Sequence, residues 1–232
     1  MAGRYLLEIS VEAVEGAAAA ERGGADRIEL CGDLSVGGVT PSVELIRGAR
    51  KQVCLPIFSM VRPRGGDFVY SPEEFAAMKR DIDIAKEFRM DGVVLGILTP
   101  DKQVDVARTR KLVELARPLP VTFHRAFDEC ADLQKALEDV IQTGATCILT
   151  SGGAATAAEG SAVLGKLVEQ AGGRIIILPG AGTNAGNIRK LVRETRAREF
   201  HSGLSSSLPR PHTDYSAFEA EVAKLAKILA DP

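Results

Sequence analysis

The segment that decides the fold is YLLEISVEAVEGAAAAERGGADRIELC, residues 5–31. It begins and ends with short runs, 5–10 and 26–31, in which apolar and polar side chains alternate as they do in strands. The alanine-rich stretch between them, 11–22, favours a helix. A strand, a helix and a second strand in succession predict a parallel β-α-β unit.

The same unit recurs to the end of the chain. Further strands are expected at 55–61, 91–98, 120–125, 146–151, 174–179 and 198–202, with a helix after each. Two of the helices have clear start signals, at Thr40-Pro41 and at Ser71-Pro72-Glu73-Glu74. Dividing 232 residues among eight units gives 29 residues each, close to the size of one βα unit.

Eight such units are the number that closes a (β/α)8 barrel. The sequence therefore predicts an α/β fold, a TIM barrel, in a single domain spanning 1–232. A doubly wound open sheet is the rival, but it usually has about five to seven strands. It would also need a glycine loop after the first strand, where this chain has Ser10-Val11-Glu12.

Composition excludes several classes of function. The chain is 45% apolar and 26% charged, which is typical of globular proteins. A net charge of -2 gives no electrostatic footprint for nucleic acid or an anionic membrane. No apolar run approaches the roughly 20 residues of a membrane span, and a signal peptide is not expected. Four cysteines without a Cys-x-x-Cys pair predict reduced thiols in the cytoplasm.

Polar residues occupy the ends of the expected strands, where barrel active sites lie. Because side chains alternate along a strand, Glu8 and Ser10 share one face, as do Glu29 and Cys31. Glu8, Glu29 and His124 are therefore candidate acid–base residues at the mouth. Buried carboxylates need partners, and those available are Arg62, Arg125, His124 and His201. A purely structural network of ion pairs is the alternative.

A second group of residues suggests an anion site. The segment PGAGTNAGN, 179–187, follows the seventh expected strand and opens a helix, a place where backbone amides favour anions. Loops after strands seven and eight hold phosphate in many barrels. The candidate substrate-binding residues are Arg62, Arg125, Ser151, Gly180, Gly182, His201 and Ser202. The alternative is that the glycines only form a tight turn.

Several motifs together resemble a known family. They are LEI at 7–9, GADRIELC at 24–31, GGVTPS at 37–42, RPRGGDF at 62–68, TFHRAFD at 122–128, LTSG at 149–152, PGAG at 179–182 and EFHS at 199–202. In this order, over nearly the whole chain, they resemble the CutC copper homeostasis family. The resemblance implies a TIM barrel, a cytoplasmic protein that forms homo-oligomers, and a proposed role in copper(I) binding.

The resemblance also implies a copper site, with one difference in this chain. In the family, copper is proposed to bind one cysteine that ends strand one and another that ends strand two. The second matches Cys31, whereas Ser10 stands at the first position. Cu(I) prefers thiolate and thioether ligands, so we expect weaker binding here than in a relative with both thiols. Met60 or His124 are candidates to complete the site.

Two functions of different classes stay open. One is a copper(I)-binding homeostasis protein with Cys31 as a ligand. The other is a TIM-barrel enzyme that acts on a small anionic or phosphorylated metabolite. The expected partner is accordingly a copper ion or a small anion, with no nucleic acid and no membrane.

Overall fold

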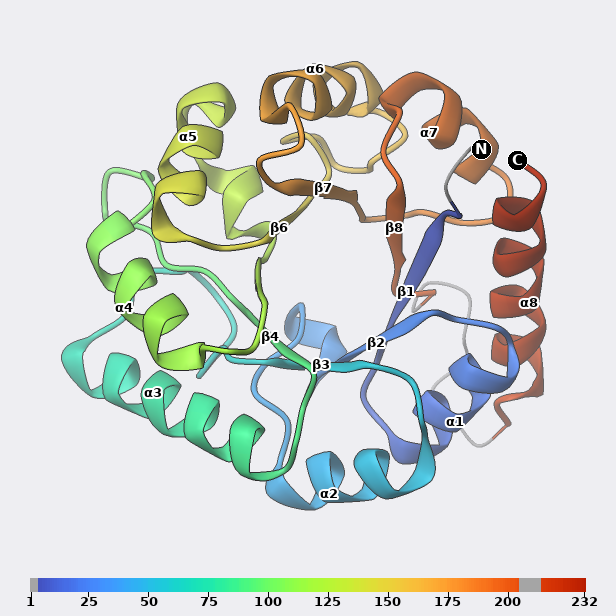
Figure 1. Ribbon diagram of the computed structural model, residues 1–232, viewed down its shortest axis with the longest axis horizontal. Helices are drawn as coiled ribbons and strands as arrows, with labels where there is room; N and C mark the ends of the chain where they lie inside the picture. The colour runs from blue at the N-terminus through green and yellow to red at the C-terminus, as the bar shows by residue number, and fades with distance from the viewer. Residues whose placement is uncertain (1–3, 205–213) are drawn as a thin grey trace.

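The computed structural model describes residues 4–204 and 214–232, and within these ranges it is a TIM barrel, as predicted (Figure 1). The strands are β1 Leu6–Val11, β2 Arg27–Leu30, β3 Ile57–Met60, β4 Gly92–Leu95, β5 Val121–Phe123, β6 Cys147–Thr150, β7 Ile176–Pro179 and β8 Glu199–Ser202. The helices are α1 Val14–Arg22, α2 Val43–Gln52, α3 Pro72–Glu87, α4 Val106–Ala116, α5 Leu133–Thr143, α6 Ser161–Ala171, α7 Ile188–Thr195 and α8 Ser216–Ala230. Two short 3₁₀ helices, η1 Leu34–Val36 and η2 Arg125–Glu129, lie in the loops after β2 and β5.

The strands form one parallel sheet in the order β7-β6-β5-β4-β3-β2-β1-β8. Its two end strands, β7 and β8, lie side by side and complete the ring, which the helices surround (Figure 1). The register of β1 places Glu8 beside Arg27 of β2 on one side and beside His201 of β8 on the other. This register brings three ionisable side chains to the same level of the barrel.

The alternation in β1 and β2 divides their side chains between two environments. Leu7, Ile9, Ile28 and Leu30 are fully buried in the main hydrophobic core, which also includes the buried faces of the helices. The residues between them are polar and point to the other side of the sheet, into the barrel. The local pattern of the first β-α-β unit therefore determines which side chains reach the interior.

The two predicted helix starts have different outcomes. Ser71 forms a capping box with Glu74, and α3 begins at Pro72 as expected. The predicted start of α2 at Thr40-Pro41 is wrong, because the helix begins at Val43 and its cap is Ser42. The Thr40 hydroxyl instead accepts the amide of Arg62 at 3.0 Å and donates to Asp81 at 2.9 Å. It therefore joins the loop after β3 to α3.

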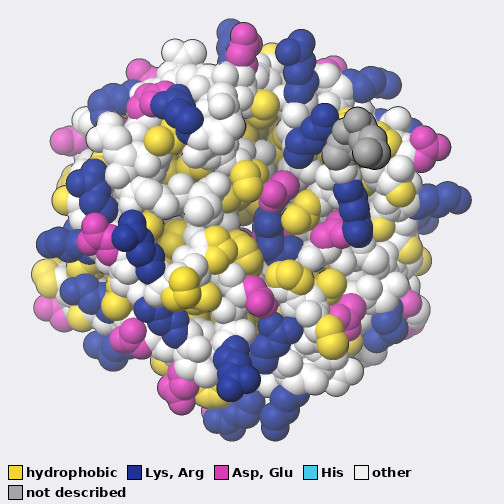
Figure 2. Space-filling model, viewed as in Figure 1, with side chains coloured by type: hydrophobic (Ala, Val, Ile, Leu, Met, Phe, Trp, Pro, Cys, Tyr) yellow, Lys and Arg dark blue, Asp and Glu magenta, His cyan; other side chains and the backbone are white. Residues whose placement is uncertain are grey.

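The molecular surface mixes charges of both signs. Figure 2 shows Lys and Arg side chains interspersed with Asp and Glu over the face seen there. Among the described residues, no helix has both the length and the apolar character that crossing a membrane requires.

Candidate functional site

A cavity of about 460 Å³ lies at the carboxyl ends of the strands. The predicted site residues that line it are Glu29, Arg62, His124, Arg125, Gly182 and His201. Five other predicted residues are buried and do not line the part of the cavity that the described residues form: Glu8, Cys31, Ser151, Gly180 and Ser202. The structure thus brings most of the predicted residues to one mouth, but only some of them can touch a ligand there.

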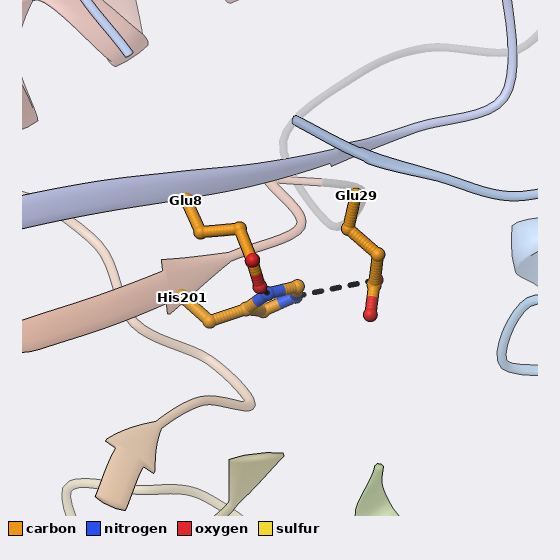
Figure 3. Close-up of side chains that lie close together, drawn as sticks. All are labelled: Glu8, Glu29 and His201. Carbon is orange, nitrogen blue, oxygen red and sulfur yellow. Dashed lines mark hydrogen bonds and ion pairs between the residues drawn. The ribbon is translucent and has the colours of Figure 1, made fainter. Parts of the chain in front are cut away.

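A buried ionic cluster borders this cavity, because Glu29 and His201 line it, and Figure 3 shows these two side chains together with Glu8. His201 is its centre: Nδ1 lies 2.8 Å from Oε1 of Glu8, and Nε2 lies 3.8 Å from Oε2 of Glu29. Arg27 donates to the other carboxylate oxygen of Glu8 and lies 2.9 Å from Glu199. Glu8 therefore holds one edge of the imidazole and leaves the opposite edge facing Glu29.

The cluster shifts the pKa values of its two carboxylates, Glu8 and Glu29, in opposite directions. Burial alone would raise the pKa of Glu8, but the charge of Arg27 and the contact with His201 outweigh it and lower this pKa to about 2. Burial raises the pKa of Glu29, and the charge of Glu8 adds to this rise against the effect of His201. Burial would lower the pKa of His201, but the two carboxylates raise it. Glu8 is thus ionised at neutral pH, whereas the environment of Glu29 favours its protonated form more than water would.

The predicted partners of the carboxylates need correction. The sequence suggested Arg62, Arg125, His124 and His201 as partners. In the described part of the chain, only His201 among them contacts Glu8 and Glu29. The main cationic partner of Glu8 is Arg27. The signal for Arg27 was present, because it has the same parity as Glu29 on β2. Sequence reasoning does not single out Arg27, because barrel sites are expected at the last residues of the strands and Arg27 begins its strand.

His124 follows β5 and caps η2 at the cavity wall. Its Nδ1 accepts the amide N–H of Ala126 at 3.2 Å, and the ring packs against Phe68 in a tilted arrangement with centroids 4.9 Å apart. Gly96 leaves room for the imidazole, since a Cβ there would lie 2.7 Å from Nδ1. Burial, helped by the charge of Arg62, lowers the pKa of His124 to about 3. The imidazole is therefore neutral.

Arg62 is largely committed to the protein. Its Nη1 donates to the carbonyls of Val36 and Gly38, both at 2.9 Å, and its Nη2 donates to that of Gly66 at 2.8 Å. These bonds fasten the loops after β2 and β3 to each other across the mouth. Of the five N–H donors, those left for a ligand are the Nε N–H, which has no hydrogen-bond partner among the described residues, and the second N–H of Nη2.

Arg125 pairs with Asp128 at 2.8 Å and with the Ser151 hydroxyl at 3.2 Å. Asp128 also accepts hydrogen bonds from Thr150, from Ser151 and from the amide of Gly153, so one carboxylate joins the loops after β5 and β6. Sequence reasoning missed this residue. Its signal was the short spacing from His124 in the segment TFHRAFD.

The loop after β7 presents unused amides to the cavity. Ala181, Gly182 and Thr183 line it, and their N–H groups have no acceptor among the described residues. Ala181 and Gly182 both have positive φ, 77° and 68°, which is the left-handed region of backbone conformation. The amide of Gly180, by contrast, donates to Thr150 at 3.0 Å. Ser202 holds the loop through the carbonyl of Thr183 at 2.6 Å.

Comparison with known proteins now identifies the family. The model of the CutC family matches residues 5–206, which contain all the site residues described above. The chain belongs to the CutC family. A relative named family protein CutC, from Chromobacterium violaceum, is 49% identical over 197 residues, which are 85% of this chain and 80% of that protein. The human copper homeostasis protein cutC homolog is 46% identical over 206 residues, covering 89% of this chain and 76% of that one.

Structural comparison agrees. A solved structure from Streptococcus agalactiae, provisionally named copper homeostasis protein CutC, superposes with a TM-score of 0.81 at 34% identity. The superposition covers 85% of this chain and 98% of that one. The TIM-barrel fold and the family that the sequence suggested are confirmed.

Two sets of side chains in this CutC family member offer metal ligands. Glu8, Glu29 and His201 each offer one ligand atom, all within 4.8 Å of one another, and no other such His, Cys, Asp or Glu group exists in the described residues. Oxygen and nitrogen donors suit harder cations than Cu(I), and the guanidinium of Arg27 already neutralises Glu8. The second set includes Cys31, whose Sγ donates to Glu29 at 3.6 Å. Burial, and then the charge of Glu29, raise the pKa of this thiol well above its ordinary value.

Proposed function

We propose that the cavity at the barrel mouth binds a small anionic metabolite and that Glu29 and His201 transfer protons to and from it. Four buried polar atoms at the cavity wall carry this proposal. Glu29 Oε1, Arg62 Nε, His124 Nε2 and Thr183 Oγ1 have no hydrogen-bond partner within the described chain. A buried polar group without a partner is costly. Four of them around one cavity favour a ligand that supplies the missing bonds.

The hydrogen-bond donors among these four atoms indicate that the ligand is an anion. Three of the four atoms, on Arg62, His124 and Thr183, donate hydrogen bonds, and the free amides of 181–183 add further donors. Such a set matches a phosphate or carboxylate group. The anion would bind at the loop after β7, and the rest of the molecule would extend toward Glu29 and His201.

The ionic cluster supplies the acid–base chemistry. Glu8 fixes the His201 ring through Nδ1, so that Nε2 is presented beside Glu29 (Figure 3). Glu29 and His201 both line the cavity, whereas Glu8 is fully buried. We assign Glu8 as a positioning residue, and Glu29 and His201 as the groups that exchange protons with the ligand.

Replacing Thr183 by Val tests the anion site. The hydroxyl has no partner in the free protein, so its loss should not affect folding. With 2-phosphoglycolate as the probe in isothermal titration calorimetry, we expect binding to weaken by about tenfold or more, since one bond to a charged group is lost. The matched control is Thr122→Val, because Thr122 also has an unpartnered buried hydroxyl but lies outside the cavity wall. Equal affinity in both variants would contradict the proposed site.

Copper(I) binding is a second candidate, and one observation favours it. A Cβ built on Gly38 would lie 3.0 Å from Cys31 Sγ and 3.5 Å from the Met60 methyl carbon, so a thiol and a thioether side chain are neighbours. Both are ligands that Cu(I) prefers. The Cys31 thiol must lose its proton and leave Glu29 before it can bind a metal. We further propose, as the resemblance implies, that the protein acts in copper homeostasis in the cytoplasm and forms homo-oligomers.

Ser10→Cys is the test of the copper candidate. Ser10 lines the cavity and lies in register with Glu29 of the neighbouring strand. Cys31 follows Glu29 by two residues in the chain. A second thiol there should raise Cu(I) affinity by about tenfold or more in an anaerobic chelator competition, because thiolate is a far better ligand than a hydroxyl. Cys31→Ser should remove the binding that exists. The same affinity in the native protein and both variants would place any copper site elsewhere.

A further inference from the structure

The tautomer of His124 is fixed by the backbone. The amide of Ala126 donates to Nδ1 at 3.2 Å, and a ring nitrogen that accepts a hydrogen bond carries no hydrogen. The single ring hydrogen of a neutral imidazole therefore lies on Nε2. No carboxylate contacts this ring among the described residues, and the lowered pKa of His124 agrees with a ring that stays uncharged.

The Nε2–H of His124 has no acceptor, although it is buried at the cavity wall. Glu29 Oε1 is an acceptor without a donor, and it belongs to the same wall. The cavity therefore offers a neutral N–H donor and a carboxylate to one ligand. A neutral imidazole held by a backbone amide is suited to polarise a carbonyl. It donates a hydrogen bond to the carbonyl oxygen, and it does not bind an anionic substrate as tightly as a permanently charged side chain would.

We propose that the substrate is a phosphate ester of a hydroxy-aldehyde or hydroxy-ketone, and that the reaction begins with enolisation. Glu29 removes a proton from the carbon next to the carbonyl. The electrons of that C–H bond form the enolate double bond, and the oxygen that becomes negative receives the hydrogen bond from His124 Nε2. Return of the proton from Glu29 to carbon completes the exchange. This inference rests on the proposed function, because the phosphate occupies the site at 181–183.

The division of roles follows from what each group contacts. Cys31 and His201 both lie beside Oε2 of Glu29, which leaves Oε1 as the oxygen directed to a ligand. Phe68 packs against the His124 ring and lines the cavity, and this apolar contact strengthens a hydrogen bond to a developing negative charge.

The experiment compares two probes, 2-phosphoglycolate and phosphoglycolohydroxamate, whose hydroxamate oxygens imitate an enediolate. We expect the native protein to bind the hydroxamate at least about tenfold tighter. His124→Phe should remove this preference, and His124→Gln should restore part of it because glutamine keeps an N–H donor. Nitrogen NMR of the native protein at about pH 7 should show a hydrogen on Nε2 and none on Nδ1.

Failure of the inference differs from failure of the proposed function. If 2-phosphoglycolate binds in a manner that depends on Thr183 but the hydroxamate preference is absent, or persists in His124→Phe, the enolisation proposal is overturned alone. A ring hydrogen on Nδ1 would overturn it in the same way and needs no variant. If neither probe binds, the proposed function fails and the inference fails with it.

Discussion

Replacing Arg27 by Met is expected to destabilise the barrel by about 3–5 kcal/mol, since removal of one member of a buried ion pair leaves its partner uncompensated. Arg27 contacts both Glu8 and Glu199, and Glu8 is fully buried. In the variant Glu8 retains only the bond to His201. Denaturant unfolding at neutral pH measures the loss. The control is Arg22→Met, which breaks the exposed pair with Glu219 and should cost less than about 1 kcal/mol.

The same variant has a characteristic pH dependence. The folded pKa of Glu8 is about 2 against an ordinary value of 4.5, so the unfolded chain binds more protons between these values. The stability that ionised Glu8 contributes is therefore fully present above about pH 4.5 and is lost as the pH falls toward 2. Without Arg27 the pKa of Glu8 is depressed less. The difference in unfolding free energy between the native protein and Arg27→Met should therefore become smaller as the pH falls from about 4.5 toward 2. A difference that does not change with pH would contradict the assigned pairing.

Asp128→Ala is the second substitution with a large expected effect. Its carboxylate accepts hydrogen bonds from the amides of Ser151 and Gly153 and from the hydroxyl of Thr150, so the variant leaves these donors without an acceptor. The Thr150 hydroxyl and the Ser151 amide belong to buried residues, whereas Gly153 is exposed. With about 1–3 kcal/mol for each buried donor that is left unsatisfied, we expect a loss of about 2 kcal/mol or more in unfolding free energy. Arg125 loses its ion pair in the same variant.

Asp67→Ala is the matched control for this prediction. Asp67 also pairs with an arginine three residues away, Arg64, but its side chain is 66% exposed. Its removal should leave the denaturation midpoint nearly unchanged. If both aspartate variants unfolded at the same denaturant concentration, Asp128 would not be the residue that joins the two loops.

The sequence determined the fold because the information for it is local. Alternating strand patterns, each followed by a helical stretch, recur with a period close to one βα unit, and eight such units close a barrel. The parity of β1 and β2 likewise showed which side chains face inward, since the period of a strand is two residues. The family was also evident, because its motifs are continuous segments such as RPRGGDF at 62–68.

The roles of individual site residues depended on partners that are distant in the chain. The register between strands, which no single strand encodes, places Arg27 beside Glu8 and His201 on its other side. Three N–H groups of Arg62 donate to backbone carbonyls of the loops. The guanidinium that was predicted to bind an anion therefore mainly holds these loops in place. The catalytic and binding roles predicted from the sequence remain predictions.

The protonation state of His124 shows the same division at one residue. Sequence alone identified an imidazole at the end of a strand, where barrel active sites lie. The tertiary structure decided that this ring is a neutral donor, because one backbone N–H occupies Nδ1 and burial disfavours the charged form. Local periodicity fixes strands, helices and the direction of side chains, whereas hydrogen-bond partners and pKa values depend on groups that only the closed barrel brings together.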